Sequence, residues 1–227
     1  MEFLTSYEQI WLKTLEDLRE SPAITVRSES IEPVDVEFGD PGTAAEEIAE
    51  DFGVNLSGVL ERCYLRFTGL GSHWATTGRF PRIAGEFHIA SLQRQLEEIP
   101  PELAWSDPSA EERQLLSELY AIDGTPESGV GSLTALRMKR GTSNPEVWFD
   151  DGGYRAWKMD IDYCEYLETL RVTKGTFGWQ YLYIDVHLRG DEYEATAARL
   201  GNMLWVFADL FPGYDYTSLQ GRLAERL

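Results

Sequence analysis

Residues 43–74 read TAAEEIAEDFGVNLSGVLERCYLRFTGLGSHW, and we expect the rest of the chain to be organised around them. Their pattern predicts two short helices joined by a tight corner. Thr43 and Glu46 have the spacing of a capping box. Apolar residues then recur at i, i+3, i+4 and i+7 until Gly53, where a left-handed helix stop costs least. Ser57 can cap the second helix, which repeats the same apolar spacing. Each helix therefore has one face suited to a core.

Elsewhere in the chain, helical and alternating patterns predict the remaining elements. Capping pairs and apolar stripes predict helices over residues 6–20, 109–122, 162–175, 191–210 and 218–227. Short β-rich runs predict strands over residues 23–27, 34–38, 78–92 (one or two strands), 134–140, 146–149, 154–158 and 179–185. The Asp150-Asp151-Gly152-Gly153 turn predicts a hairpin. At 227 residues the chain is long enough for one large domain, and we expect a single domain over residues 1–227.

Charge is the strongest compositional feature of the chain. Its 39 Asp and Glu residues outnumber 20 Lys and Arg residues, which gives a formal net charge of -19. Direct binding to nucleic acid or to an anionic membrane depends on basic side chains, so both partner classes are disfavoured. A basic protein is the partner that fits. The alternative is that acidity serves only solubility.

The N-terminus and the cysteine content bear on localisation. The chain starts MEFLTSYEQIW, without a basic segment followed by an apolar run, and nothing approaches 18 consecutive apolar residues. We therefore expect no signal peptide, no membrane span and a cytoplasmic protein. The two cysteines, Cys63 and Cys164, are too few for a disulfide framework, and we interpret both as buried thiols.

Catalytic and metal-binding motifs are not evident in the sequence. The three histidines lie far apart without metal-ligand spacing. Asp160 and Asp162 could hold a divalent ion, but a helix cap explains Asp162 without a metal, and we favour the cap. We expect no cofactor and no enzymatic activity. The remaining enzyme hypothesis is a site built from dispersed residues such as His73, Asp160 and Glu165.

The order of the pieces resembles a known family. The segment IAEDFGVNLSGVLERCYLRFTGLGSHW is similar to the opening signature of the SUKH superfamily, to which the yeast cell-wall assembly regulator belongs. The strand-like FHIASL, the hairpin around NPEVWFDDGGYRAWKMD and the helix DYCEYLETL resemble later family elements. The resemblance covers residues 43–172, with a divergent patch at about 97–140. Residues 1–42 and 173–227 would be elaborations.

This resemblance implies an α+β fold with a mixed or antiparallel sheet flanked by helices, with extra helices at both ends of the chain, and a role in protein binding. Many bacterial members look like immunity proteins, which neutralise secreted or contact-delivered toxins, often nucleases or deaminases. An acidic protein of this kind could occupy the basic substrate groove of such a toxin. The alternative is a regulatory or scaffold module. We nominate as partner-binding residues a turn tip and an aromatic strand face: Asp150, Asp151, Trp179, Tyr181 and Asp185.

Overall fold

The computed structural model describes residues 4–98, 101, 107–152 and 156–227. The α-helices are α1 (Ser6–Glu20), α2 (Pro41–Phe52), α3 (Ser57–Cys63), α4 (Leu92–Leu96), α5 (Ala110–Ser117), α6 (Tyr163–Thr173), α7 (Glu194–Leu210) and α8 (Thr217–Arg226). The short 3-10 helices are η1 (Val36–Phe38), η2 (Trp179–Leu182) and η3 (Asp191–Tyr193). The strands are β1 (Ile24–Ile31), β2 (Leu70–Thr76), β3 (Ala84–Ile89), β4 (Leu119–Gly124), β5 (Leu133–Arg137), β6 (Glu146–Asp150) and β7 (Ala156–Lys158).

The strands form two antiparallel sheets. The first sheet has the order β1-β2-β3 and the second the order β4-β5-β6-β7. The sheets meet where β3 runs beside β4. At this seam the backbone N–H of His88 donates to Oδ1 of Asp123 at 2.9 Å. The predicted α+β class is confirmed, and every pairing between the described strands is antiparallel rather than mixed.

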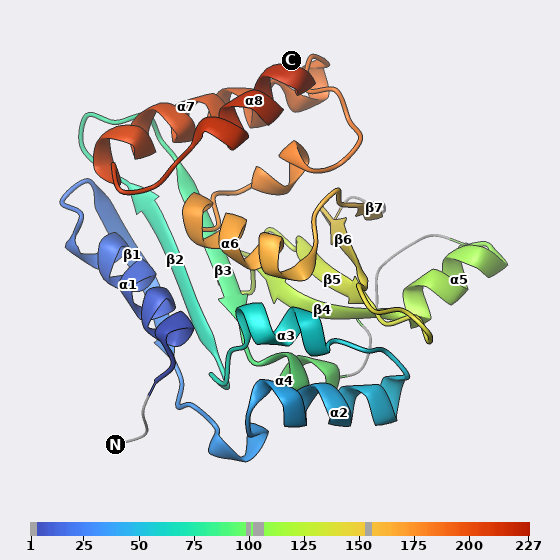
Figure 1. Ribbon diagram of the computed structural model, residues 1–227. Helices are drawn as coiled ribbons and strands as arrows, with labels where there is room; N and C mark the ends of the chain where they lie inside the picture. The colour runs from blue at the N-terminus through green and yellow to red at the C-terminus, as the bar shows by residue number, and fades with distance from the viewer. Residues whose placement is uncertain (1–3, 99–100, 102–106, 153–155) are drawn as a thin grey trace.

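Helix α6 lies in the middle of the molecule, in front of the two sheets (Figure 1). The predicted capping box is confirmed, because the side chain of Asp162 accepts from the backbone of Glu165 and the Glu165 carboxylate accepts from the backbone of Asp162. The predicted inner stripe of this helix is buried in the core, at Tyr163, Tyr166, Leu167 and Leu170. Local capping and apolar spacing were therefore enough to place this helix.

The helical pair that opened the sequence analysis is present as α2 and α3, with different starts. Asp40, rather than Thr43, caps α2, because its carboxylate accepts from the backbone N–H groups of Gly42 and Thr43. Pro41 then occupies the first turn, where its missing N–H costs nothing. Gly53 ends α2 in the left-handed conformation, as predicted.

Four strand assignments need correction. The predicted strand at 34–38 is wrong: beyond an isolated bridge at Val34 this segment forms η1, which the side chain of Asp35 caps. The predicted strand at 179–185 is also wrong, since η2 begins after Gly178. Strand β2 was not predicted, and β4 replaces the last part of the predicted helix over 109–122. Residues 153–155 of the predicted hairpin lie outside the described residues, but β6 and β7 pair on either side of them.

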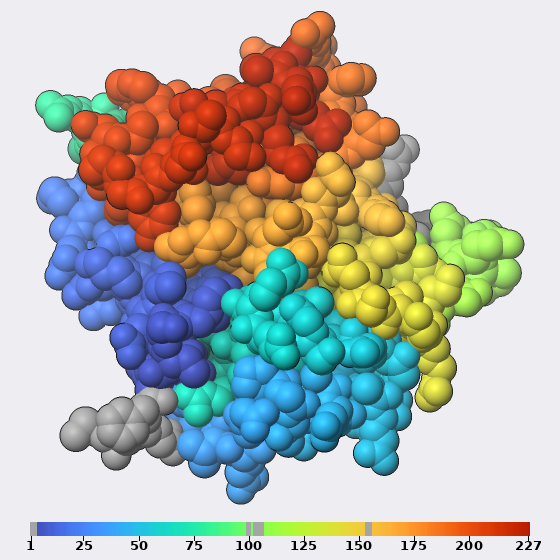
Figure 2. All heavy atoms as spheres, in the orientation of Figure 1, coloured from blue at the N-terminus to red at the C-terminus, as the bar shows by residue number. Residues whose placement is uncertain are grey.

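Figure 2 shows the face on which α6 reaches the surface, between α3 on one side and the C-terminal helices α7 and α8 on the other. Among the described residues, the longest apolar helices fall short of what a membrane crossing requires. The face of α6 that reaches this surface carries the candidate site.

Candidate functional site

A hollow of about 650 Å³ lies between the start of α6 and the end of α8. We call it the α6 cleft. Its charged lining consists of five carboxylates and two cationic side chains, a formal balance of -3: Glu146, Asp160, Asp162, Glu165, Asp185, Lys158 and Arg226. Such a balance favours a cationic occupant.

The helix start fixes one wall of the α6 cleft. Asp162 and Glu165 are held by the reciprocal capping bonds of α6, at 2.8 and 2.9 Å. Asp162 also accepts from Nη2 of Arg62 on α3, at 2.7 Å. Burial alone would raise the pKa of Asp162, but the hydrogen bonds from Arg62 and from the Glu165 backbone outweigh it and hold the pKa below its usual value. Asp162 is therefore a fixed negative charge.

Two further carboxylates stand in open solvent. The Asp160 and Asp185 side chains are 86% and 106% exposed. Arg222 and Arg226 of α8 reach them at 3.6 Å. Exposed ion pairs at this separation contribute little to folding, so a partner's cation can replace either arginine at small cost.

On the opposite wall, Glu146 joins β6 to β7. Its carboxylate accepts from Lys158 at 2.7 Å and from the indole N–H of Trp148 at 3.0 Å. Arg137 on β5 adds a longer contact of 3.3 Å. Burial would raise the pKa of Glu146, but these donors together lower it. This wall is rigid and its charge is already compensated.

Two smaller hollows, of about 350 and 420 Å³, continue along the exposed face of α6. Tyr183 lines both of them and the α6 cleft. The guanidinium of Arg222 lies 4.0 Å from the centre of the Tyr183 ring. The three hollows therefore form one groove between α6 and α8, whose acidic end is the α6 cleft.

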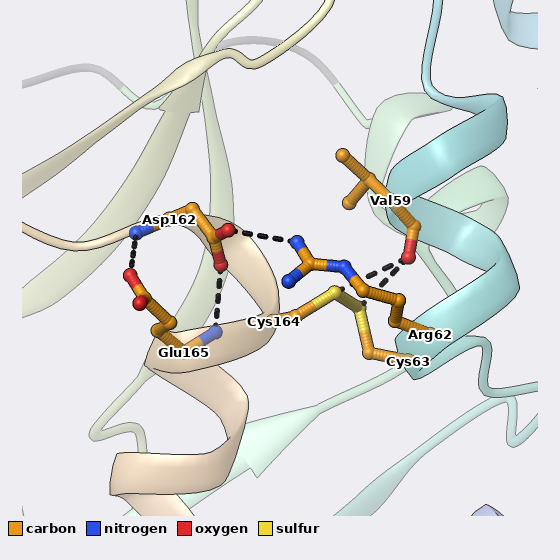
Figure 3. Close-up of a disulfide and its surroundings, with 6 residues drawn as sticks. All are labelled: Val59, Arg62, Cys63, Asp162, Cys164 and Glu165. Carbon is orange, nitrogen blue, oxygen red and sulfur yellow. Dashed lines mark hydrogen bonds and ion pairs between the residues drawn. A yellow bond between two sulfur atoms is a disulfide. The ribbon is translucent and has the colours of Figure 1, made fainter.

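A disulfide holds the α3 side of this groove. Cys63 and Cys164, 101 residues apart in sequence, form it with a Cα–Cα distance of 5.5 Å (Figure 3). Both cysteines are buried, as predicted, but the interpretation as thiols is wrong. The physical reason is tertiary: α3 and α6 pack side by side, which brings their two buried sulfur atoms together. The ion pair between Arg62 and Asp162 flanks the disulfide.

The nominated partner-binding residues do not form one surface. Asp185 lines the α6 cleft. Asp150 is buried, and Asp151 accepts a hydrogen bond of 2.6 Å from the hydroxyl of Tyr181. Trp179 and Tyr181 are 1% and 9% exposed, so they pack in the core rather than offering an aromatic face. The expected exposed aromatic strand does not exist, because this segment is η2.

The dispersed enzyme residues are also divided. Asp160 and Glu165 share the α6 cleft, but His73 lines a different hollow, on the first sheet. The sequence pointed to Asp160 and Glu165 as candidate site residues, whereas Arg62, Arg222 and Arg226 were not predicted. A signal for Arg222 and Arg226 was their i, i+4 spacing, which places them on one face of a helix. In the described part of the chain, no group of three or more His, Cys, Asp or Glu residues is arranged to hold a metal ion.

Comparisons with protein-family models, with curated proteins and with solved structures found no match for this chain.

Proposed function

We propose that this protein is an immunity protein that binds a basic toxin domain, of the nuclease or deaminase kind, through the α6 cleft. The observation that carries the proposal is the charge of that cleft: five carboxylates converge on it against two cations, on a chain whose net charge is -19. The resemblance of residues 43–172 to the SUKH superfamily supplies the toxin-neutralising role. The role requires binding and no chemical step.

The arrangement suits exchange of ion pairs. Asp160 and Asp185 are exposed and held by arginines at 3.6 Å, longer than a direct hydrogen bond. Lysine or arginine side chains from a partner can approach these carboxylates more closely. The neighbouring Asp162 and Glu165 are fixed by the helix cap, so their positions need no rearrangement on binding.

The overall charge adds long-range attraction. A net charge of -19 steers a basic domain toward the protein and raises the association rate, and the effect weakens as salt screens it. The negative charge of this protein also disfavours acidic partners, because like charges that face each other at an interface cost several kcal/mol. The proposed binding should therefore be fast, selective for basic partners and sensitive to salt.

The test uses two variants with the same change of charge. The cleft variant neutralises three carboxylates of the α6 cleft through Asp160→Asn, Glu165→Gln and Asp185→Asn, and Gln at position 165 can keep the capping box. The α2 variant, which is the matched control, neutralises three exposed carboxylates of α2 through Glu46→Gln, Glu50→Gln and Asp51→Asn. Tagged wild type and both variants are used to capture partners from the native lysate and secretome, and the captured proteins are identified by mass spectrometry.

We expect wild type and the α2 variant to capture a basic toxin domain, and the cleft variant to lose it. Equal loss from both variants would mean that bulk charge, rather than the cleft, drives binding. Capture of regulatory complexes alone, by all three proteins, would replace immunity with the scaffold alternative. Matching thermal melts of the three proteins establish that folding is unchanged.

We further propose that the protein acts in the cytoplasm, with the Cys63–Cys164 bond as one of the disulfides that are rare in the cytosol. Fractionation of native cells tests the location, and we expect the protein to be recovered with cytosolic markers. Recovery from an oxidising compartment would overturn this proposal.

A further inference from the structure

A second hollow, of about 440 Å³, lies on the first sheet, and we call it the sheet hollow. Its floor is set by strand register. Ser28 of β1, His73 of β2 and Glu86 of β3 are cross-strand partners and therefore share one face. Ser30, Gly71 and His88 form the next row on the same face. The floor is thus an array of small and polar residues.

The loop after β4 walls the sheet hollow on one side, through Pro126 and Glu127. Glu86 holds this loop, because its carboxylate oxygens accept from the backbone N–H groups of Glu127 and Ser128 at 2.6 and 2.8 Å. Gly71 lies in the middle of the floor, where there is no room for a side chain, because a Cβ would lie 2.7 Å from the carbonyl oxygen of Phe87. The hollow is therefore built by fixed backbone rather than by mobile side chains.

His73 is the feature of this hollow that points to a ligand. Its side chain belongs to a residue that is only 9% exposed, and it lines the hollow. Within the described part of the chain its ring contacts that of Phe177, at 6.4 Å between centroids, and no protein group is hydrogen-bonded to the imidazole. Its nitrogens are not among the buried atoms that lack a partner, so they are open to the hollow and available to a ligand.

Charge defines the class of ligand. The described lining residues include no Lys or Arg and four glutamates, of which Glu29 is paired with Arg19 at 3.3 Å. The others are Glu32 and Glu127 at the rim and Glu86 on the floor. An ionised carboxylate offers about four acceptor positions, so Glu86 keeps capacity after its two backbone bonds. A neutral imidazole nitrogen adds one acceptor. The hollow therefore favours a cation rich in N–H donors.

We propose that the sheet hollow binds a small organic cation, whose ammonium or guanidinium group is held between His73 and Glu86. The volume of about 440 Å³ falls within the range of small-molecule sites. The cation is either a free polyamine or the tip of a Lys or Arg side chain from another protein. This inference does not rest on the proposed function, since the α6 cleft has a separate lining.

The full chain is titrated at pH 8 with spermidine, with agmatine, and with capped tripeptides Gly-Lys-Gly and Gly-Arg-Gly, by calorimetry and by amide NMR. The variants are His73→Phe, which keeps a ring beside Phe177, and Ser30→Leu, which fills the hollow from the edge strand. Glu50→Gln on α2 is the control, because it removes one exposed carboxylate that does not line the sheet hollow. Thermal melts check the fold of each variant.

We expect one cation per chain, with NMR shifts centred on residues 28, 73 and 86. Loss of a hydrogen bond to a charged ligand should weaken binding by about tenfold to a hundredfold in His73→Phe, and Glu50→Gln should bind as wild type. Binding of the amines identifies a free polyamine, and binding of the tripeptides alone identifies a partner's side chain. Failure of all four probes, or equal weakening in Glu50→Gln and His73→Phe, overturns the proposal.

Discussion

The α6 cleft and the sheet hollow both carry an excess of carboxylates, but they hold their charge in opposite ways. In the α6 cleft, Asp160 and Asp185 project into solvent and each has an arginine nearby. In the sheet hollow, Glu86 is 4% exposed and is fixed by two backbone N–H groups. The first is a surface that a large charged partner can approach, and the second is a smaller hollow whose central carboxylate is buried.

This difference separates two roles of charge in one acidic protein. Exposed charges act at a distance, so they govern association rate and salt dependence more than the strength of a contact. Buried charges act over one hydrogen bond, so they select the shape and donor pattern of a ligand. If the two regions are independent, a change in one should leave the other intact.

Removal of the disulfide should have the largest effect and should act on the α6 cleft. In the chain-entropy model a closed loop of about 100 residues stabilises a protein by about 4.7 kcal/mol, and the loop between Cys63 and Cys164 is of this size. We expect Cys63→Ala with Cys164→Ala to lower the free energy of unfolding toward this amount, measured by urea denaturation. The double variant should also weaken partner capture, because Arg62 and Asp162 flank the bond.

Cation binding in the sheet hollow should survive this change, because that site lies on β1, β2 and β3. Wild type treated with dithiothreitol should behave as the double variant does. If the reductant changes the stability of neither protein and the double variant matches wild type, the two cysteines are thiols in solution. Equal damage to both sites would show that the two regions are coupled.

Asp123, at the seam between β3 and β4, should make the unfolding free energy depend on pH with the opposite sign to that of carboxylates whose pKa is lowered on folding. Asp123 is buried, and this burial raises its pKa to about 7 despite hydrogen bonds from Tyr166 and from the His88 backbone. Its contribution to stability is full below the unfolded pKa near 4 and is lost as pH rises through 7. At 1.36 kcal/mol per pKa unit, the loss is up to about 4 kcal/mol.

Asp123→Asn removes this titration. Between pH 4.5 and 7 we therefore expect the unfolding free energy of wild type to fall relative to that of the variant, as followed by urea denaturation at each pH. Carboxylates with a lowered pKa, such as Asp162, make the unfolding free energy rise with pH only below this pH range, so they do not mask the difference between wild type and variant. Parallel pH profiles for the two proteins would refute the assignment.

A buried lysine between the two regions should give a smaller effect at higher pH. Burial lowers the pKa of Lys174 to about 8, although Asp17 opposes the shift. Its ammonium donates to Tyr214 at 2.7 Å, beside the groove of α6, and its carbonyl accepts from the indole of Trp74 on β2 at 2.6 Å. The folded state binds this proton less tightly than the unfolded state, so stability should rise from pH 8 toward pH 10.

The full shift corresponds to about 3 kcal/mol at 1.36 kcal/mol per unit. Lys174→Met keeps a non-glycine residue at the same positive φ and removes the charge, so its stability should be flat over this pH range. Denaturation at pH 7, 8, 9 and 9.5 measures the difference. A wild-type profile as flat as that of the variant would mean that the ammonium is solvated.

Local patterns predicted the helices but not the sites. Asp162 and Glu165 could be recognised because a capping box is contained within four residues. The segment from Trp179 to Tyr183 was wrongly predicted as a strand. All of its side chains are buried, so the alternation of residue types along it did not distinguish a core face from a solvent face. Strand β2 was missed because both of its faces are buried and two glycines flank its start. The pairing of His73 with Glu86, and of Cys63 with Cys164, depends on register and packing that a single sequence does not encode locally.

The smallest effect on stability, and the sharpest contrast with the sheet hollow, is expected from the charges of the α6 cleft. Exposed ion pairs contribute about 0–1 kcal/mol, so Asp160→Asn, Glu165→Gln and Asp185→Asn together should change the unfolding free energy by less than about 1 kcal/mol. The same variant should associate with the captured basic partner about tenfold more slowly at low salt, since electrostatic steering is the main contribution of such groups. Stopped-flow measurements at two salt concentrations test this, with the α2 variant as control. An unchanged association rate combined with faster dissociation would mean that these carboxylates are desolvated in the complex, as Glu86 already is in the free protein.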